Sequence, residues 1–190
     1  MSSTTASRTQ SLARIALSIA IITVSAWVTI PIGPVPFTLQ CFAVALAICV
    51  LPALESLYAV GGYLLLGAFG VPVFSGMRGG FSVLAGVTGG FLWGYFIAVA
   101  VSLLVLKLFE RLGQNRTLVA CICASLVYLL IAYLCGTVQY MAVAGASLPA
   151  ALATCVIPFV PVDLIKIVAA SVVAVAVQRA LGLNTAPKRA

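Results

Sequence analysis

The sequence predicts an all-α integral membrane protein with six transmembrane helices, and two observations lead to this fold class. First, the 190 residues are 64% hydrophobic and only 7% charged, whereas a soluble domain is about 45–50% apolar and about 25% charged. Second, the apolar residues form runs near the roughly 20 residues that a helix needs to cross about 30 Å of hydrocarbon. Six such runs with short connections leave no room for a separate soluble domain.

Each element follows from an apolar run and from the residues that interrupt it. Three prolines in residues 31–36 remove amide donors and fix φ, so the first span ends before them. Pro52 ends the second span, and a charge cluster in residues 107–116 separates the fourth from the fifth. Pro158 and Pro161 mark a kink or an entry turn in the sixth. The expected spans are residues 12–30, 38–51, 54–69, 83–106, 118–135 and 150–180.

The charges between these spans predict the orientation of the chain. Most cations fall on the side that holds both termini, and the positive-inside rule places that side in the cytoplasm. They are Arg8, Arg14, Lys107, Arg111, Arg116, Arg179, Lys188 and Arg189. We therefore expect a flexible cytoplasmic N-terminus (residues 1–11), a membrane domain (12–181) and a basic cytoplasmic tail (182–190) in a protein of the cell membrane.

Three connections rich in proline or glycine then share the external face: residues 31–37, 70–82 and 136–149. Residues 70–82 contain few polar groups for an ordinary surface loop. Irregular backbone at membrane depth is tolerated only where it is buried in protein or lines a cavity. These external connections are therefore expected to form a ligand pocket.

Composition also excludes several function classes. The cations lie at the edges of apolar runs, which does not fit a nucleic-acid-binding face. The six cysteines include no C-x-x-C pair, and there is no histidine, so neither a zinc site nor a disulfide framework is predicted. The chain has no Walker motif for ATP phosphates. No base stands beside a serine or cysteine nucleophile, so we do not expect an enzyme.

Asp163 and Lys166 are the first candidate site residues. They stand three residues apart in the last span, which places them on one face of a helix. An ionisable group within a span is costly unless it is paired or solvated, and it marks a functional site by default. The alternative is a structural ion pair that fixes helix packing. Their position beneath the Pro/Gly-rich connections favours the floor of a pocket.

Arg78 is the one charge in the external segment 70–82. Its guanidinium group either reaches lipid headgroups or binds a carboxylate, for which its planar fork is suited. Arg78 and Lys166 carry +2 and Asp163 carries −1, so a monoanionic ligand would neutralise the group. Thr38 and Gln40 open the second span, and the Gln40 amide is expected either to hydrogen-bond an amide-like ligand or to cap the helix.

Small residues form two stripes at helical spacing. Small side chains let helices approach closely in lipid, so we expect the longer stripe to pack against another helix rather than contact ligand. It comprises Gly86, Gly90, Gly94, Ala98 and Ser102. A shorter stripe, Ala16 and Ala20 in the first span, suits either helix packing or a partner protein.

Several stretches together resemble the BioY family. Three of them are residues 30–40 (IPIGPVPFTLQ), residues 63–76, with YLLLG and PVFSG, and residues 158–166 (PFVPVDLIK). Two shorter ones are residues 86–90 (GVTGG) and 135–137 (CGT). They are spread in order from the first span to the last. Two positions depart from the family pattern, Val87 in place of Pro and Val162 in place of Gly.

The resemblance implies the substrate-binding S-component of an energy-coupling factor vitamin transporter, with biotin as ligand and no cofactor. It also implies partners, a membrane coupling subunit and two cytoplasmic ATPases, with the face of Ala16 and Ala20 docking the coupling subunit. Some family members are reported to work without dedicated partners. The implied transport mechanism is toppling of the loaded subunit in the membrane.

The chemistry of biotin suggests a role for each candidate. Asp163 would accept hydrogen bonds from the ureido N–H groups, and Lys166 would donate to the ureido carbonyl. Arg78 would meet the carboxylate at the mouth, or Lys166 and Arg78 would exchange these roles. Phe74 and Tyr140 would supply apolar walls, as ligand pockets commonly have. The alternative is a stand-alone small carrier or channel, which would need a continuous polar path through the membrane.

Overall fold

The structure is a computed structural model in which residues 2–114 and 116–181 are described, so the expected basic tail at 182–190 lies outside the described residues. Apart from one short hairpin, the regular structure of the described chain is helical. Its elements are α1 (Ser2–Trp27), β1 (Thr29–Ile30), β2 (Phe37–Thr38), α2 (Gln40–Val50), α3 (Ala53–Ala68), α4 (Phe81–Ala85), α5 (Gly89–Arg111), α6 (Leu118–Ala144), α7 (Leu148–Cys155) and α8 (Val160–Ala180).

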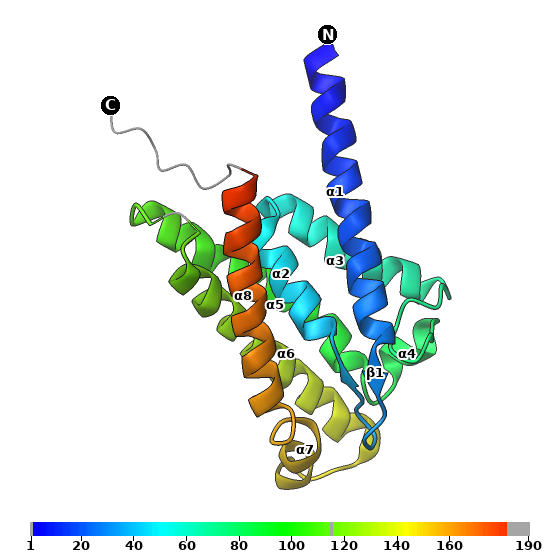
Figure 1. The fold of residues 1–190 in the computed structure, drawn as a ribbon. Coiled ribbons are helices and arrows are strands. Elements are labelled where there is room, and N and C mark those ends of the chain that lie inside the picture. Colours follow the sequence, from blue (N-terminus) through cyan, green and yellow to red (C-terminus); the bar gives the residue numbers. More distant parts are fainter. Residues whose placement is uncertain (1, 115, 182–190) are drawn as a thin grey trace.

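The long helices run back and forth between two ends of a bundle (Figure 1). The start of α1 and the end of α8 lie at one end, which we call the terminal end. The β1–β2 hairpin and α7 lie at the other end, which we call the loop end. The start of α1 and the end of α8 therefore share one end of the bundle, and the Pro/Gly-rich hairpin lies at the opposite end.

Within the described residues, four helices are long and apolar enough to cross a membrane: α1, α5, α6 and α8. Two further apolar helices are shorter, because α2 has 11 residues and α3 has 16. At 1.5 Å per residue these correspond to about 16 and 24 Å, less than the roughly 30 Å of a bilayer core. The helical multi-pass membrane class is confirmed, with helices of unequal length.

Several predicted boundaries are wrong. α1 begins at Ser2 rather than at Leu12. The predicted span 83–106 is interrupted, because α4 ends at Ala85 and α5 begins at Gly89. The predicted span 150–180 is divided between α7 and α8, and this break lies at Pro158, where a kink or an entry turn was predicted. Apolar composition continues across these breaks, so hydropathy does not reveal them.

The predicted external connection 136–149 is mostly helix. α6 continues to Ala144, and Gly145 ends it in the left-handed conformation (φ 62°). No proline interrupts residues 136–144, so the backbone can stay helical although the stretch contains glycine, threonine and glutamine. In contrast, the proline-rich segment 31–36 is non-helical as predicted and forms the turn of the hairpin, in which Thr29 pairs with Thr38.

The core forms around α2, whose side chains are mostly buried and which packs against α1, α6 and α8. α5 and α6 also pack closely along the predicted glycine stripe. A Cβ atom added at Gly94 would lie 2.9 Å from Cys135 Cβ, and one at Gly90 would collide with the Cys135 carbonyl oxygen. The packing role expected for this stripe is therefore confirmed for these glycines, whereas Gly86 lies outside α5, at the end of α4.

The terminal end of α2 is held by side chains from α8 and from the α5–α6 connection. Arg116 Nη1 donates hydrogen bonds to the carbonyl oxygens of Cys49 (2.8 Å) and Leu51 (2.6 Å). Gln178 Nε2 donates to the Cys49 carbonyl oxygen as well, at 2.6 Å. These contacts satisfy carbonyl groups that the end of a helix leaves without an intrahelical partner.

Candidate functional site

A cavity of about 70 Å³ lies between α2, α5, α6, α8 and the segment that follows α3. Most of its wall is apolar or aromatic, and the charged side chains in it are Arg78, Asp163 and Lys166. The lining residues that carry the argument below are Thr38, Gln40, Phe74, Tyr95, Tyr128 and Tyr133, with those three charges. Six of the seven ligand-binding residues predicted from the sequence thus meet at one cavity.

Asp163 and Lys166 form an ion pair in the first turns of α8. Lys166 Nζ lies 2.8 Å from Asp163 Oδ1, and the two side chains are 11% and 8% exposed. Tyr133 donates its hydroxyl hydrogen bond to Asp163 Oδ2 at 2.8 Å. Lys166 Nζ also donates to the backbone carbonyl of Thr38 at 2.7 Å. The pair therefore ties α8 to α6 and to the hairpin while it faces the cavity.

This ion pair suits a binding site electrostatically. Asp163 lies in the first turn of α8, where the helix dipole favours a negative charge. The two hydrogen bonds of Lys166 use two of the three donors of an ammonium group. Each carboxylate oxygen of Asp163 accepts one of the bonds above, and a carboxylate has about four acceptor positions. Both side chains therefore keep hydrogen-bonding capacity that their protein contacts do not use.

Thr38, at the end of β2, and Gln40, at the start of α2, line the cavity. Leu39 is the N-cap residue of that helix, and it makes no side-chain capping bond. Thr38 Oγ1 accepts a hydrogen bond from the Gln40 backbone N–H at 3.3 Å. The Gln40 side chain is 3% exposed, and its amide donates to the Tyr63 hydroxyl at 2.9 Å. The capping alternative for the Gln40 side chain is therefore wrong.

Phe74 and Arg78 are held by a tight turn after α3. The Phe74 N–H donates to the Arg78 carbonyl oxygen at 2.9 Å, and Gly76 (φ 70°) and Met77 (φ 55°) lie in the left-handed region between them. The Phe74 ring is 1% exposed and lies edge-on to Tyr63, with ring centroids 5.4 Å apart. The turn thus places a buried ring inside the cavity wall.

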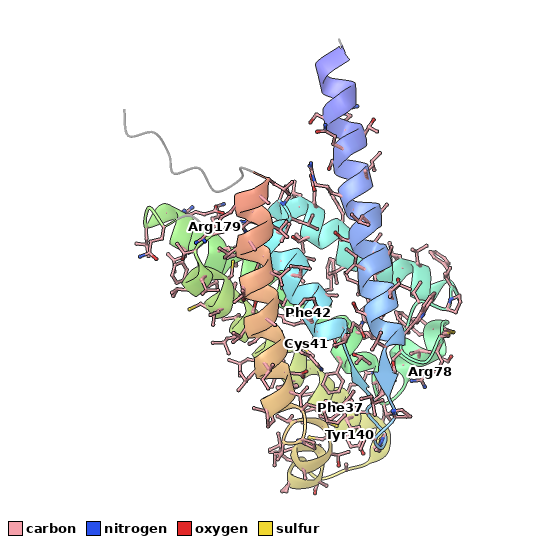
Figure 2. All side chains as sticks on the ribbon, viewed as in Figure 1. Phe37, Cys41, Phe42, Arg78, Tyr140 and Arg179 are labelled. Carbon is pink, nitrogen blue, oxygen red and sulfur yellow. The ribbon has the colours of Figure 1, made fainter. Side chains whose placement is uncertain are left out.

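Arg78 is exposed on the same turn, at the loop end of the molecule (Figure 2). Its Nε donates to the Ser75 carbonyl oxygen at 3.1 Å. A second hollow of about 380 Å³ adjoins the cavity, and Arg78, Val83 and Thr88 line both. The guanidinium group therefore stands where the outer hollow meets the inner cavity.

Tyr140 is not among the residues that line the cavity. It packs instead in a separate buried cluster at the loop end, with Val35, Ala151, Cys155 and Phe159. Figure 2 shows Tyr140 beside Phe37 near the hairpin. The expectation that Tyr140 supplies a cavity wall is therefore wrong, because α6 extends past the cavity and carries Tyr140 beyond it.

The structure adds aromatic residues that the sequence reasoning missed. Tyr95, Tyr128 and Tyr133 line the cavity from α5 and α6, and Phe91 and Phe159 join them. The signal available in the sequence was a tyrosine within a strongly apolar helix. Such a residue needs a partner for its hydroxyl in a membrane. Tyr133 precedes Tyr140 by two helical turns, and it is Tyr133 that contacts Asp163.

Ala16 and Ala20 lie on α1, far along the chain from the cavity-lining residues. Both are exposed, whereas Ile15 and Ile19 of the same helix pack against a buried cluster from α2 and α3. The small-residue face of α1 is therefore directed away from the described helices.

The family model described as "BioY family" matches residues 1–183. A Thermotoga maritima protein named biotin transporter BioY is 51% identical over 82 residues, which are 43% of this chain and 48% of that protein. Lactococcus lactis biotin transporter BioY2 is 52% identical over 87 residues, 46% of this chain and 48% of the relative. These two alignments therefore span about half the length of each relative.

A longer alignment is found with the probable biotin transporter BioY of Pyrococcus horikoshii. It is 34% identical over 160 residues, which are 84% of this chain and 91% of that protein. A solved structure described as the S-component for biotin from an ECF-type ABC transporter superposes with a TM-score of 0.85. It covers 94% of this chain and 95% of that chain at 22% identity, so it supports the fold.

Proposed function

Because the chain belongs to the BioY family, we propose that it is the biotin-binding S-component of an energy-coupling factor transporter, which captures external biotin for uptake. The observation that carries this proposal is the cavity at the loop end, where three charges and several aromatic rings from distant parts of the chain meet. The family is one of transporters, and the chain is not an enzyme.

Biotin matches the cavity by its three chemical parts. Its ureido ring offers two N–H donors and a carbonyl acceptor, which the Asp163 carboxylate and the Lys166 ammonium complement. Its thiophane ring and aliphatic chain suit apolar walls such as Phe74. Its carboxylate suits a guanidinium group, and Arg78 stands at the outer edge of the cavity. The net charge of these three side chains is +1, and a ligand monoanion would neutralise it.

Entry of biotin requires the cavity to enlarge. Its volume of about 70 Å³ is well below the about 300–1,000 Å³ typical of ligand pockets. The segment between α3 and α4 forms part of the wall, and its backbone is irregular rather than helical. We propose that it swings outward at the adjoining hollow, with Arg78 on its surface to attract the anion.

We further propose that α1, α2, α3, α5, α6 and α8 all cross the cell membrane with the terminal end in the cytoplasm. The described cations at or near the terminal end are Arg8, Arg14, Lys107, Arg111, Arg116 and Arg179, which fits the positive-inside rule. The short helices α2 and α3 lie against longer neighbours. The exposed face with Ala16 and Ala20 supports docking of a membrane coupling subunit, through which two ATPases would drive transport.

Binding of biotin by the purified chain tests the proposal. Calorimetric titration in detergent is expected to show one biotin bound per chain, and an excess of a different carboxylate vitamin should not displace it. Mass spectrometry of the small molecule that co-purifies with the chain provides an independent check. Absence of biotin binding would overturn the proposal. Ion-gradient-driven uptake by vesicles that contain only this chain would favour the stand-alone carrier instead.

A further inference from the structure

One buried hydroxyl group in the cavity wall is not explained by the contacts of the protein itself. Tyr128 lies on α6, is 0% exposed and lines the cavity. No described protein group meets its hydroxyl oxygen with hydrogen-bond geometry, although the Tyr95 hydroxyl and the Cys41 thiol lie close enough to interact with it electrostatically. Buried polar side-chain atoms nearly always have such a partner, so this exception calls for a cause.

Four buried side-chain atoms in the described part of the chain lack a partner, and they belong to Ser102, Tyr128, Thr137 and Gln178. Only Tyr128 belongs to the cavity lining. Gln178 lies at the terminal end, where its amide nitrogen already bonds to Cys49. Tyr128 is therefore the unpartnered group for which a ligand can supply the missing bond.

The position of Tyr128 indicates the kind of ligand atom that it would meet. Tyr133, whose hydroxyl contacts Asp163, follows it by five residues on the same helix, so its Cα atom lies about 7.5 Å farther along the helix axis toward the loop end. Lys166 lies nearly one turn after Asp163 on α8, which runs from the loop end to the terminal end, so it lies nearer than Asp163 to the level of Tyr128. Around Tyr128 the cavity wall is formed by Leu129, by the small Ala132 and by the ring of Tyr95, whose centroid lies 5.5 Å from that of Tyr128. A neutral polar atom suits this level of the cavity better than a carboxylate, which would require a cation.

We propose that the Tyr128 hydroxyl is a specificity-determining group that donates a hydrogen bond to the ureido carbonyl oxygen of biotin. This inference rests on the function proposed above. The Asp163 carboxylate accepts hydrogen bonds and suits the ureido N–H groups, whereas a phenol hydroxyl can donate to the carbonyl. A carbonyl oxygen has two acceptor positions, so Lys166 and Tyr128 can share it. The ureido ring then enters first, and the carboxylate remains toward Arg78.

Tyr128→Phe removes the hydroxyl and keeps the ring, and it provides the test. We expect the Kd of the purified variant for biotin to rise about five- to tenfold, the size of one neutral hydrogen bond. The same factor is expected for the sulfur-free analogue desthiobiotin and for biotin methyl ester, because both keep the ureido group. Tyr58→Phe, at an exposed tyrosine of α3, is the matched control and should leave each Kd unchanged.

A second measurement separates ligand binding from a structural role. In the absence of biotin, Tyr128→Phe should leave the thermal midpoint unchanged or raise it, because the hydroxyl has no protein bond to lose. A clear fall in that midpoint would show a protein partner and overturn the inference. So would a Kd within twofold of wild type, or a loss that disappears with desthiobiotin or with the methyl ester. If the wild-type chain does not bind biotin, the proposed function fails first, and this inference fails with it.

Discussion

The terminal end and the loop end both contain buried charged or polar side chains, but they use them differently. At the terminal end, Arg116 and Gln178 donate to the last carbonyl groups of α2. At the loop end, Asp163 and Lys166 bond to each other and to protein groups, yet they also face a cavity that contains an unpartnered hydroxyl. Burial of a charge alone therefore does not distinguish the two ends, whereas the cavity beside the buried charges does.

The largest expected effect is a loss of biotin affinity, and it is expected for a substitution of Asp163 at the loop end. Asp163→Ala would leave the Lys166 ammonium buried without its counter-ion, and removing one partner of such a pair costs about 2–5 kcal/mol in binding. We expect biotin affinity to fall by about 30-fold or more in a calorimetric titration. Asp163→Asn keeps the size and one acceptor oxygen and should lose less. An affinity for Asp163→Ala within twofold of wild type would show that the ion pair only joins helices.

The next largest effect is expected for a substitution at the terminal end, and it should lower the stability of the protein rather than its affinity for biotin. Arg116→Ala removes the charged donor from the Cys49 and Leu51 carbonyl groups, and hydrogen bonds to a charged group contribute about 1.5–3 kcal/mol. The thermal midpoint in detergent should fall, whereas the biotin Kd should stay within about threefold of wild type. Arg111→Ala, at an exposed arginine of α5, is the control. A selective loss of biotin binding in Arg116→Ala would show that the terminal end also contributes to ligand binding, and it would contradict the contrast between the two ends.

A smaller effect is expected for Arg78 because its side chain is exposed. Arg78→Ala should weaken binding of biotin about tenfold, the range of an exposed charge-assisted hydrogen bond. The loss should shrink at high salt, which screens exposed charges, and it should be absent with biotin methyl ester. Titrations at two salt concentrations with both ligands measure this. An equal loss of affinity for the neutral ester would show that Arg78 acts by stabilising the turn and not by binding the carboxylate of biotin.

The smallest effect is expected for the Arg14–Glu55 ion pair at the terminal end. Arg14 Nε lies 2.7 Å from Glu55 Oε2, and Ser11 donates to the same carboxylate. The Arg14 side chain is 46% exposed, and such pairs contribute about 1 kcal/mol or less. Glu55→Gln should therefore lower the thermal midpoint only slightly and leave the biotin Kd unchanged. A change in biotin affinity would show that the contact between α1 and α3 influences ligand binding in the cavity.

Much of the candidate site was predictable because charges are so rare in this chain. Asp163, Lys166 and Arg78 stand out in an apolar sequence, and the structure brings all three to one cavity. Tyr140 falls within residues 136–149, which the sequence predicted to be an external connection. The helix in fact continues to Ala144, and it is the Tyr133 hydroxyl that donates a hydrogen bond to Asp163. Apolar residues are compatible with helix and with buried irregular backbone, so hydropathy could not locate that boundary.

By itself the sequence determined that this is a multi-pass helical membrane protein, that a proline-rich turn follows the first helix, and which three charges lie at the candidate site. These features follow from local chemistry, namely the cost of charge in hydrocarbon and the lack of an amide donor in proline. Tertiary structure alone decided that Tyr133 pairs with Asp163, that Gln40 bonds to Tyr63 and that the Tyr128 hydroxyl is left without a partner. Those outcomes depend on which helix faces are brought together across distances of up to 30 residues in the chain, and a local pattern does not encode that choice.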